Sequence, residues 1–207
     1  MPIPVYREAH PEAQADAALK LNNDYLIEWL TAFLRSEVQK KRRVQRVVLG
    51  LSGGIDSAVS AALAARAFEP ENVYCFMMPY KISAQSSLDD ARAVAAALGV
   101  NEQVVDITAM VDGYLGNEPD ADPTRVGNVC ARCRMIVLFD QSAKLGALPI
   151  GTGNKTERLF GYYTWHGDDA PPVNPIGDLF KTQVFDLARA LALPEQVISK
   201  PPTADLV

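Results

Sequence analysis

The stretch from Val47 to Ser57 reads V-V-L-G-L-S-G-G-I-D-S and constrains the fold more than any other part of the chain. Its first half, 47–51, is a continuous apolar run of strand length, the pattern of a strand buried on both faces of a parallel sheet. Its second half runs through two adjacent glycines into an Ala-rich helix, 58–67. Glycine permits positive φ and lets backbone N–H groups approach an oxyanion, so this turn predicts a phosphate or pyrophosphate ligand.

Three polar side chains make this prediction more specific. Ser52 and Ser57 supply hydroxyl donors, but Asp56 places a carboxylate where the phosphate is expected, and the two charges would repel. A divalent cation between them removes the conflict, because Mg²⁺ typically takes one or two carboxylates together with substrate phosphates. The alternative is that Asp56 or Ser57 only caps the helix. Capping would explain one of the three polar residues and neither glycine.

The rest of the chain alternates between predicted strands and predicted helices. Strands are predicted at 46–51, 73–78, 102–107 and 148–152, and helices at 23–38, 57–68, 87–98, 126–145, 155–160 and 178–191. This alternation predicts an α/β fold, a doubly wound parallel sheet flanked by helices, with the ligand outside the carboxyl ends of the strands. Residues 1–22 are expected to be a lead-in, and 23–207 a single domain.

Composition excludes several classes of function. A net charge of -5 argues against general nucleic-acid or membrane-surface binding, and the basic cluster at 40–43 with Arg46 is interpreted as a solvated helix end. No stretch has the length of a membrane span, and the N-terminus lacks the apolar core of a signal peptide, so a cytoplasmic setting is expected. Three cysteines do not form a disulfide framework of even count.

The hexapeptide 52–57 resembles the S-G-G-x-D-S loop of the ATP pyrophosphatases, which cleave ATP between the α and β phosphates. It lacks the lysine of the G-x-x-x-x-G-K-[ST] loop. Five further blocks, in the family's own order, resemble the NAD synthetases over roughly residues 23–207. They are Met78-Pro79-Tyr80, R-V-G-N-V-C-A-R-C-R-M at 125–135, G-T-G-N-K-T-E at 151–157, N-P-I-G-D-L-F-K-T-Q at 174–183 and K-P-P-T-A-D-L at 200–206.

The resemblance implies a Rossmann-like fold of the adenine nucleotide alpha hydrolase type and an ammonia-dependent ligase that forms a C–N bond. ATP adenylates the nicotinate carboxylate of deamido-NAD with release of pyrophosphate, and ammonia then gives NAD and AMP. The resemblance implies that Asp56 and Lys181 are catalytic, that Asp56 and Glu157 bind Mg²⁺, and that Arg132 binds deamido-NAD. The implied ATP site is Gly50, Leu51, Ser52, Gly53, Gly54, Ile55, Asp56, Ser57, Thr152, Lys181 and Thr203. The family also implies a homodimer whose interface helps build the substrate site.

These roles agree with the chemistry of the residues. Adenylation is accelerated when charge on the departing pyrophosphate is neutralised, which Mg²⁺ and the point charge of Lys181 would do. Taken singly, Lys181 could be a solvated helix lysine, and Glu157 a first-turn residue favoured by the helix dipole. Arg132 is expected to be largely buried among apolar helix neighbours, where a guanidinium needs an anionic or acceptor partner.

The sequence departs from the family pattern at two places in the loop before Asn174. Trp165 stands where many members have a lysine, and Pro172 where many have an aspartate; both of those residues contact deamido-NAD in the family. Members also continue for tens of residues past the 200–206 block, with an acidic loop and late substrate contacts. The 207 residues contain no counterpart of the glutamine-hydrolysing domain of longer relatives, so free ammonia is the expected nitrogen donor.

Two other functions compete with this one. A tRNA-thiolating pyrophosphatase would use Cys130-Ala-Arg-Cys133 as cluster ligands, but a cluster needs further ligands and Cys75 lies in a predicted buried strand. We therefore interpret Cys130 and Cys133 as helix residues. A sensor of the same fold would bind ATP or AMP without turnover, and Glu157 and Lys181, both positioned for chemistry, count against it.

Overall fold

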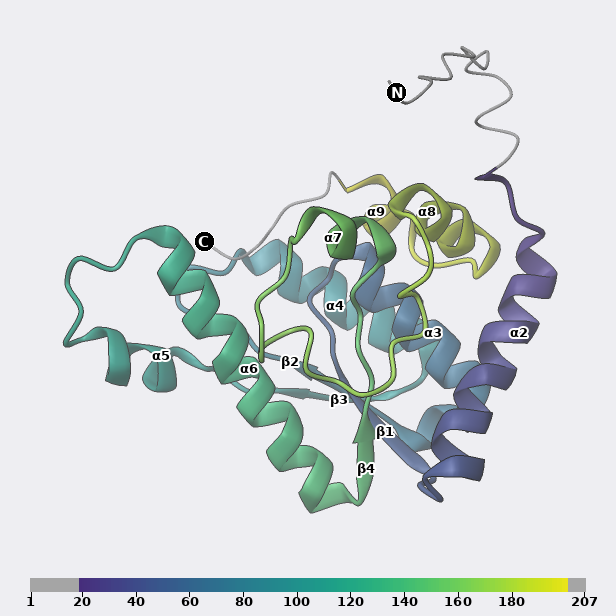
Figure 1. Cartoon of the computed structure of the whole chain (residues 1–207), viewed down its shortest axis with the longest axis horizontal. Helices are drawn as coiled ribbons and strands as arrows, with labels where there is room; N and C mark the ends of the chain where they lie inside the picture. The colour runs from purple at the N-terminus through teal and green to yellow at the C-terminus, as the bar shows by residue number, and fades with distance from the viewer. Residues whose placement is uncertain (1–18, 201–207) are drawn as a thin grey trace, which may run out of the picture.

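The computed structural model describes residues 19–200, which form one parallel sheet between two layers of helices (Figure 1). The strands are β1 (Arg46–Gly50), β2 (Val73–Met77), β3 (Asn101–Val104) and β4 (Ala147–Pro149), in the order β3-β2-β1-β4. The α-helices are α2 (Asn23–Arg35), α3 (Ile55–Phe68), α4 (Gln85–Leu98), α5 (Thr108–Leu115), α6 (Pro123–Leu145), α7 (Lys155–Phe160), α8 (Lys181–Ala190) and α9 (Glu195–Ser199). Two short turns of helix, η1 (Ser36–Lys41, π-helical) and η2 (Pro70–Asn72, 3₁₀), complete the elements.

The predicted fold class is confirmed, because every strand pair is parallel and the chain adds strands on both sides of β1. β1 pairs with β2, through Leu49 opposite Cys75, and with β4, through Val47 opposite Leu148. In such a sheet the crevice lies where neighbouring strands lead in opposite directions, outside their carboxyl ends. Here that point lies between β1 and β4.

The core has two parts, one on each face of the sheet, because β1 is apolar on both sides. Val47 and Leu49 are fully buried against the layer that contains α2, α3, α4, α8 and α9. Val48, between them, is fully buried against α6 on the opposite face. This is the burial that the continuous apolar run predicted, since successive side chains of a strand point to opposite faces.

Several predicted boundaries were wrong, mainly where the chain is exposed. The third strand, predicted at 102–107, is β3 at the sheet edge, and all four of its residues are exposed. The strand predicted to 152 ends at Pro149, and only an isolated bridge from Ile150 to Val173 continues it. α5 and α9 were not predicted, because each is short and buries only one or two side chains.

The helix predicted at 178–191 is shorter in the structure, since α8 begins at Lys181. Residues 174–179 turn instead, with Leu179 N–H donating to the Ile176 carbonyl at 3.0 Å. The helix predicted at 23–38 ends as α2 at Arg35 and continues as η1. Of the expected lead-in, 1–22, only the last four residues fall within the described range. No helix in that range combines the length and apolarity needed to cross a membrane.

Candidate functional site

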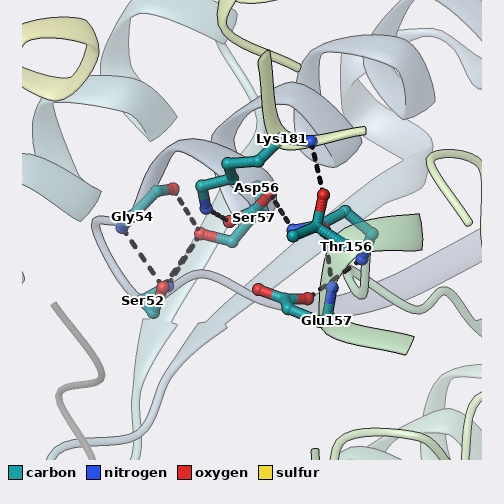
Figure 2. A network of polar contacts seen from close by, with 8 residues as sticks. Ser52, Gly54, Asp56, Ser57, Thr156, Glu157 and Lys181 are labelled. Carbon is teal, nitrogen blue, oxygen red and sulfur yellow. Dashed lines mark hydrogen bonds and ion pairs between the residues drawn. The ribbon is translucent and has the colours of Figure 1, made fainter. Parts of the chain in front are cut away.

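The glycine turn lies at the carboxyl end of β1 and leads directly into α3 (Figure 2). Gly53 has φ +82°, which non-glycine residues rarely adopt, and a Cβ placed on it would lie 2.1 Å from the Ser87 carbonyl oxygen. Gly54 precedes the helix in extended conformation, and no side chain caps α3. The alternative that Asp56 or Ser57 only caps the helix is therefore wrong. Both side chains make other contacts.

The two serines hold the turn in shape. Ser57 Oγ donates to the Gly54 carbonyl at 2.9 Å and accepts from the Ser52 backbone N–H at 3.2 Å. Ser52 Oγ lies 3.1 Å from Ser57 Oγ and accepts from the Gly54 N–H at 3.2 Å. Leu51 N–H donates to the Phe76 carbonyl of β2 at 2.9 Å, which fixes the start of the turn to the sheet. The turn is thus preorganised by its own side chains.

Asp56, in the first turn of α3, contacts two residues that are distant in sequence. Its Oδ1 accepts from Asn154 Nδ2 at 2.9 Å, and its Oδ2 forms an ion pair with the Lys181 ammonium (Figure 2). Both side chains of the ion pair are largely buried, Asp56 with 17% and Lys181 with 24% of the side chain exposed. The Lys181 N–H also donates to Thr156 Oγ1 at 3.0 Å, which joins the start of α8 to α7.

Glu157 is held beside Asp56 by a capping box at the start of α7. Its carboxylate accepts from the Asn154 N–H at 3.0 Å, while Asn154 Oδ1 accepts from the Glu157 N–H at 3.0 Å. Burial raises the pKa of Glu157 above its ordinary value, and the nearby charge of Asp56 raises it further, against the hydrogen bond from Asn154. Two adjacent carboxylates that repel each other in a partly buried site are the kind of pair that a divalent cation neutralises.

Asn154 was missed as a site residue, although it contacts both carboxylates and is only 1% exposed. A local signal existed, because Asn three residues before Glu is a capping-box pattern. That pattern predicts a helix start and nothing about Asp56. The contact of Asn154 with Asp56 depends on β1 and β4 lying side by side.

The structure places the other predicted residues at different distances from this cluster. Gly50 to Ile55 form the end of β1 and the turn, and Thr152 lies just beyond β4, in the segment that leads to Asn154. Thr203 lies outside the described residues. The burial predicted for Arg132 is wrong, since its side chain is exposed on α6 and donates to the Trp165 carbonyl at 3.2 Å.

Comparison with known proteins identifies the family of the chain. The family model described as NAD synthase matches residues 26–207, which is most of the chain. The chain belongs to the NAD synthase family. Its resemblance to NAD synthetases is thereby confirmed.

Individual relatives and solved structures give the extent of the similarity. The chain is 52% identical to an NH(3)-dependent NAD(+) synthetase of Chlorobaculum tepidum, over 86% of this chain and 64% of that relative's length. A structure of the NH3-dependent NAD synthetase of Campylobacter jejuni matches with TM-score 0.83 and 39% identity, covering 88% of this chain and 80% of the other. NMN synthetase of Francisella tularensis matches with TM-score 0.85 and 29% identity, over 90% and 78% of the two chains. The chain thus spans a little under two thirds of the Chlorobaculum relative.

Proposed function

We propose that this chain carries the ATP-dependent amidation of deamido-NAD by ammonia. The carboxylate oxygen of the nicotinate ring attacks the α-phosphorus of ATP, and pyrophosphate leaves. Ammonia then attacks the acyl carbon, the C–O bond to AMP breaks, and a proton is lost as NAD forms. The observation that carries the proposal is the cluster of Asp56, Glu157 and Lys181 beside the glycine turn, in a chain similar to ammonia-dependent relatives.

The proposed ATP site follows from this geometry. The Ser52 and Gly54 N–H groups and the Ser57 hydroxyl are engaged within the turn, so phosphate oxygens would bind here by replacing these bonds, with Lys181 as an added positive charge. Thr152 and Thr203 remain predicted contacts. Asp56 and Glu157 would hold Mg²⁺, since this ion typically takes one or two carboxylates together with substrate phosphates. When bound, Mg²⁺ would supply neutralisation of the charge that develops on the pyrophosphate.

Deamido-NAD and the second subunit are proposed to meet on the α6 side of the molecule. Arg132, Ile136 and Phe139 are spaced at 4 and 3 residues, so they share one face of α6. Ile136 is 52% and Phe139 40% exposed, and α5 adds the exposed Tyr114. Apolar side chains on the face that bears Arg132 favour a homodimer whose interface borders the substrate site. Light scattering should give a dimer, and Ile136→Asp should give monomers that still bind ATP.

Two alternatives make different predictions in the same assay. The Francisella relative is called NMN synthetase, so the deamido form of NMN is a second candidate substrate. The tRNA-thiolating function is disfavoured, because all three cysteines are buried and free and no group of three potential metal ligands occurs among residues 19–200. Burial raises the pKa of the Cys130 and Cys133 thiols, which opposes thiolate ligation.

The decisive assay combines ATP and Mg²⁺ with either deamidated substrate, and with ammonium or glutamine as nitrogen donor. Pyrophosphate and NAD should form with deamido-NAD and ammonium, and not with glutamine. If product forms from deamido-NMN and not from deamido-NAD, the substrate would be the mononucleotide. ATP binding without product in any combination would indicate the sensor function. Stoichiometric iron or zinc on the purified protein would favour tRNA thiolation.

A further inference from the structure

The back of the glycine turn rests on the N-terminal end of α4 (Gln85–Leu98), at Ser87 in its first turn and Asp90 in its second. A Cβ placed on Gly53 would meet the Ser87 carbonyl at 2.1 Å and the Asp90 Cβ at 3.2 Å. Gly53 therefore has α4 backbone in direct contact, with no space for an intervening side chain. Any movement of this end of α4 would be transmitted to the glycine turn.

The first turn of α4 has little apolar contact to hold it. No side chain caps the helix at Ala84, and the fully buried apolar residues of α4, Ala91, Val94 and Ala95, all lie further along it. Leu88 is only partly buried against the core. Polar contacts must therefore contribute much of the restraint at this end of the helix.

Lys200, the residue after α9, supplies such contacts. Its Nζ lies 3.0 Å from Ser87 Oγ and 3.0 Å from Asp90 Oδ2, the same two residues that meet Gly53. The Lys200 and Asp90 side chains are only 23% and 14% exposed, and Gln196 Nε2 donates to Asp90 Oδ1 at 3.1 Å. By contrast, Arg92 Nη1 lies 3.9 Å from Asp89 Oδ1 on the same helix, and the two side chains are 49% and 60% exposed.

We propose that Lys200 is a positioning residue of the nucleotide site, which holds the first turn of α4 against Gly53 and so keeps the phosphate turn in its binding shape. The inference rests on the proposed function. Lys200 acts through its contacts with α4 and does not itself contact the phosphates. It also opens the 200–206 block, so the same contact fixes the point from which the chain continues toward Thr203.

The test measures Mg-ATP binding to the full chain by titration calorimetry, together with KM and kcat. Lys200→Met should raise the Kd and KM for ATP by up to about 100-fold, the factor by which a misplacement near 1 Å can slow a reaction, and leave the KM for deamido-NAD unchanged. Lys200→Arg, which keeps the charge and the donors, should retain most of the affinity. Arg92→Met is the matched control and should bind ATP as the wild type does.

A double variant separates positioning from stability. Lys200→Met leaves the Asp90 charge without its cation, whereas Lys200→Met with Asp90→Asn removes both charges and should recover much of the thermal stability. ATP affinity should not recover. Wild-type affinity in Lys200→Met, or affinity that returns with stability in the double variant, would overturn the proposal. A wild-type chain that binds ATP but forms no NAD defeats only the proposed function, and one that binds no ATP defeats both.

Discussion

Asn154 Nδ2 donates to Asp56 Oδ1 at 2.9 Å, across a separation of 98 residues in the chain. The Oδ1 atom of the same amide accepts from the Glu157 N–H at 3.0 Å. Asn154 therefore positions both carboxylates that are proposed to bind Mg²⁺, Asp56 through its side-chain amide and Glu157 through its backbone N–H, which donates to the Glu157 carboxylate at 3.0 Å. Residues that orient metal ligands in this way are often nearly as important as the ligands, and their loss costs about 10- to 100-fold in metal affinity or activity.

Replacement of Asn154 should separate its two contacts. Asn154→Ala loses the N-cap of α7, which costs about 1 kcal/mol in the free energy of unfolding, and also frees Asp56. Asn154→Ser keeps a capping oxygen but loses the bond to Asp56. Both variants should lose roughly 10- to 100-fold in kcat/KM, measured as pyrophosphate release at saturating Mg²⁺, while urea unfolding should detect a larger loss for the Ala variant, which also loses the cap. Full activity in Asn154→Ser would show that the bond to Asp56 has no role.

Asp56→Asn should abolish turnover and leave the fold intact. The substitution removes one of two carboxylates for Mg²⁺ and leaves the Lys181 ammonium, 24% exposed, without its counter-charge. Pyrophosphate release measures the effect, and circular dichroism tests the fold. Asp186→Asn is the control, because Asp186 pairs with Arg189 on the exposed surface of α8, where an ion pair contributes little. Unchanged activity in Asp56→Asn would contradict the metal assignment.

The raised pKa of Glu157 predicts a pH-dependent stability. Because its folded pKa lies above the ordinary value of 4.5, ionised Glu157 disfavours the folded state, and the stability present below that pH is lost as the pH rises through the folded pKa. Glu157→Gln removes this titration and can keep the capping box. The melting temperature of the variant should exceed that of the wild type at pH 8, with the difference vanishing below pH 4.5.

Ligand binding should act in the opposite direction to the burial of the Glu157 charge. Addition of Mg²⁺ and ATP at pH 8 should raise the melting temperature of the wild type more than that of Glu157→Gln, because the variant has lost one proposed metal ligand. Equal shifts in the two proteins would argue that Glu157 does not contact the metal. A variant less stable than wild type at pH 8 without ligand would show that burial of the charge is compensated elsewhere.

Gly53→Ala should be far more damaging than another glycine substitution at positive φ. Gly146 has φ +59° and open space around it, so Gly146→Ala incurs mainly the left-handed strain of about 1–2 kcal/mol. At Gly53 the new Cβ would also collide with the Ser87 carbonyl at 2.1 Å. Urea unfolding should show the larger loss for Gly53→Ala, accompanied by loss of ATP binding. Equal losses for the two variants would mean that α4 moves aside freely.

Local patterns predicted the elements whose own residues determine them. The apolar run of 47–51 predicted a strand buried on both faces, and 155–160 was predicted as a helix, because strand burial and helix caps leave short-range signals. Exposed elements were predicted less well. The edge strand β3 carries no apolar pattern, and the predicted burial of Arg132 failed because a helix with apolar residues on several faces does not reveal which of them is covered.

The sequence by itself predicted the glycine turn, since only glycine readily takes the positive φ of Gly53 and has no Cβ to collide with the Ser87 carbonyl. The resemblance to a family indicated which residues far from the turn in sequence share its site, but only the tertiary structure decided how their side chains meet. Asp56 reaches Asn154 and Lys181, 98 and 125 residues away, because β4 pairs with β1 and α8 packs on α3. Those contacts depend on which strands and helices become neighbours, and that choice is made by burial of the whole core, which no local pattern encodes.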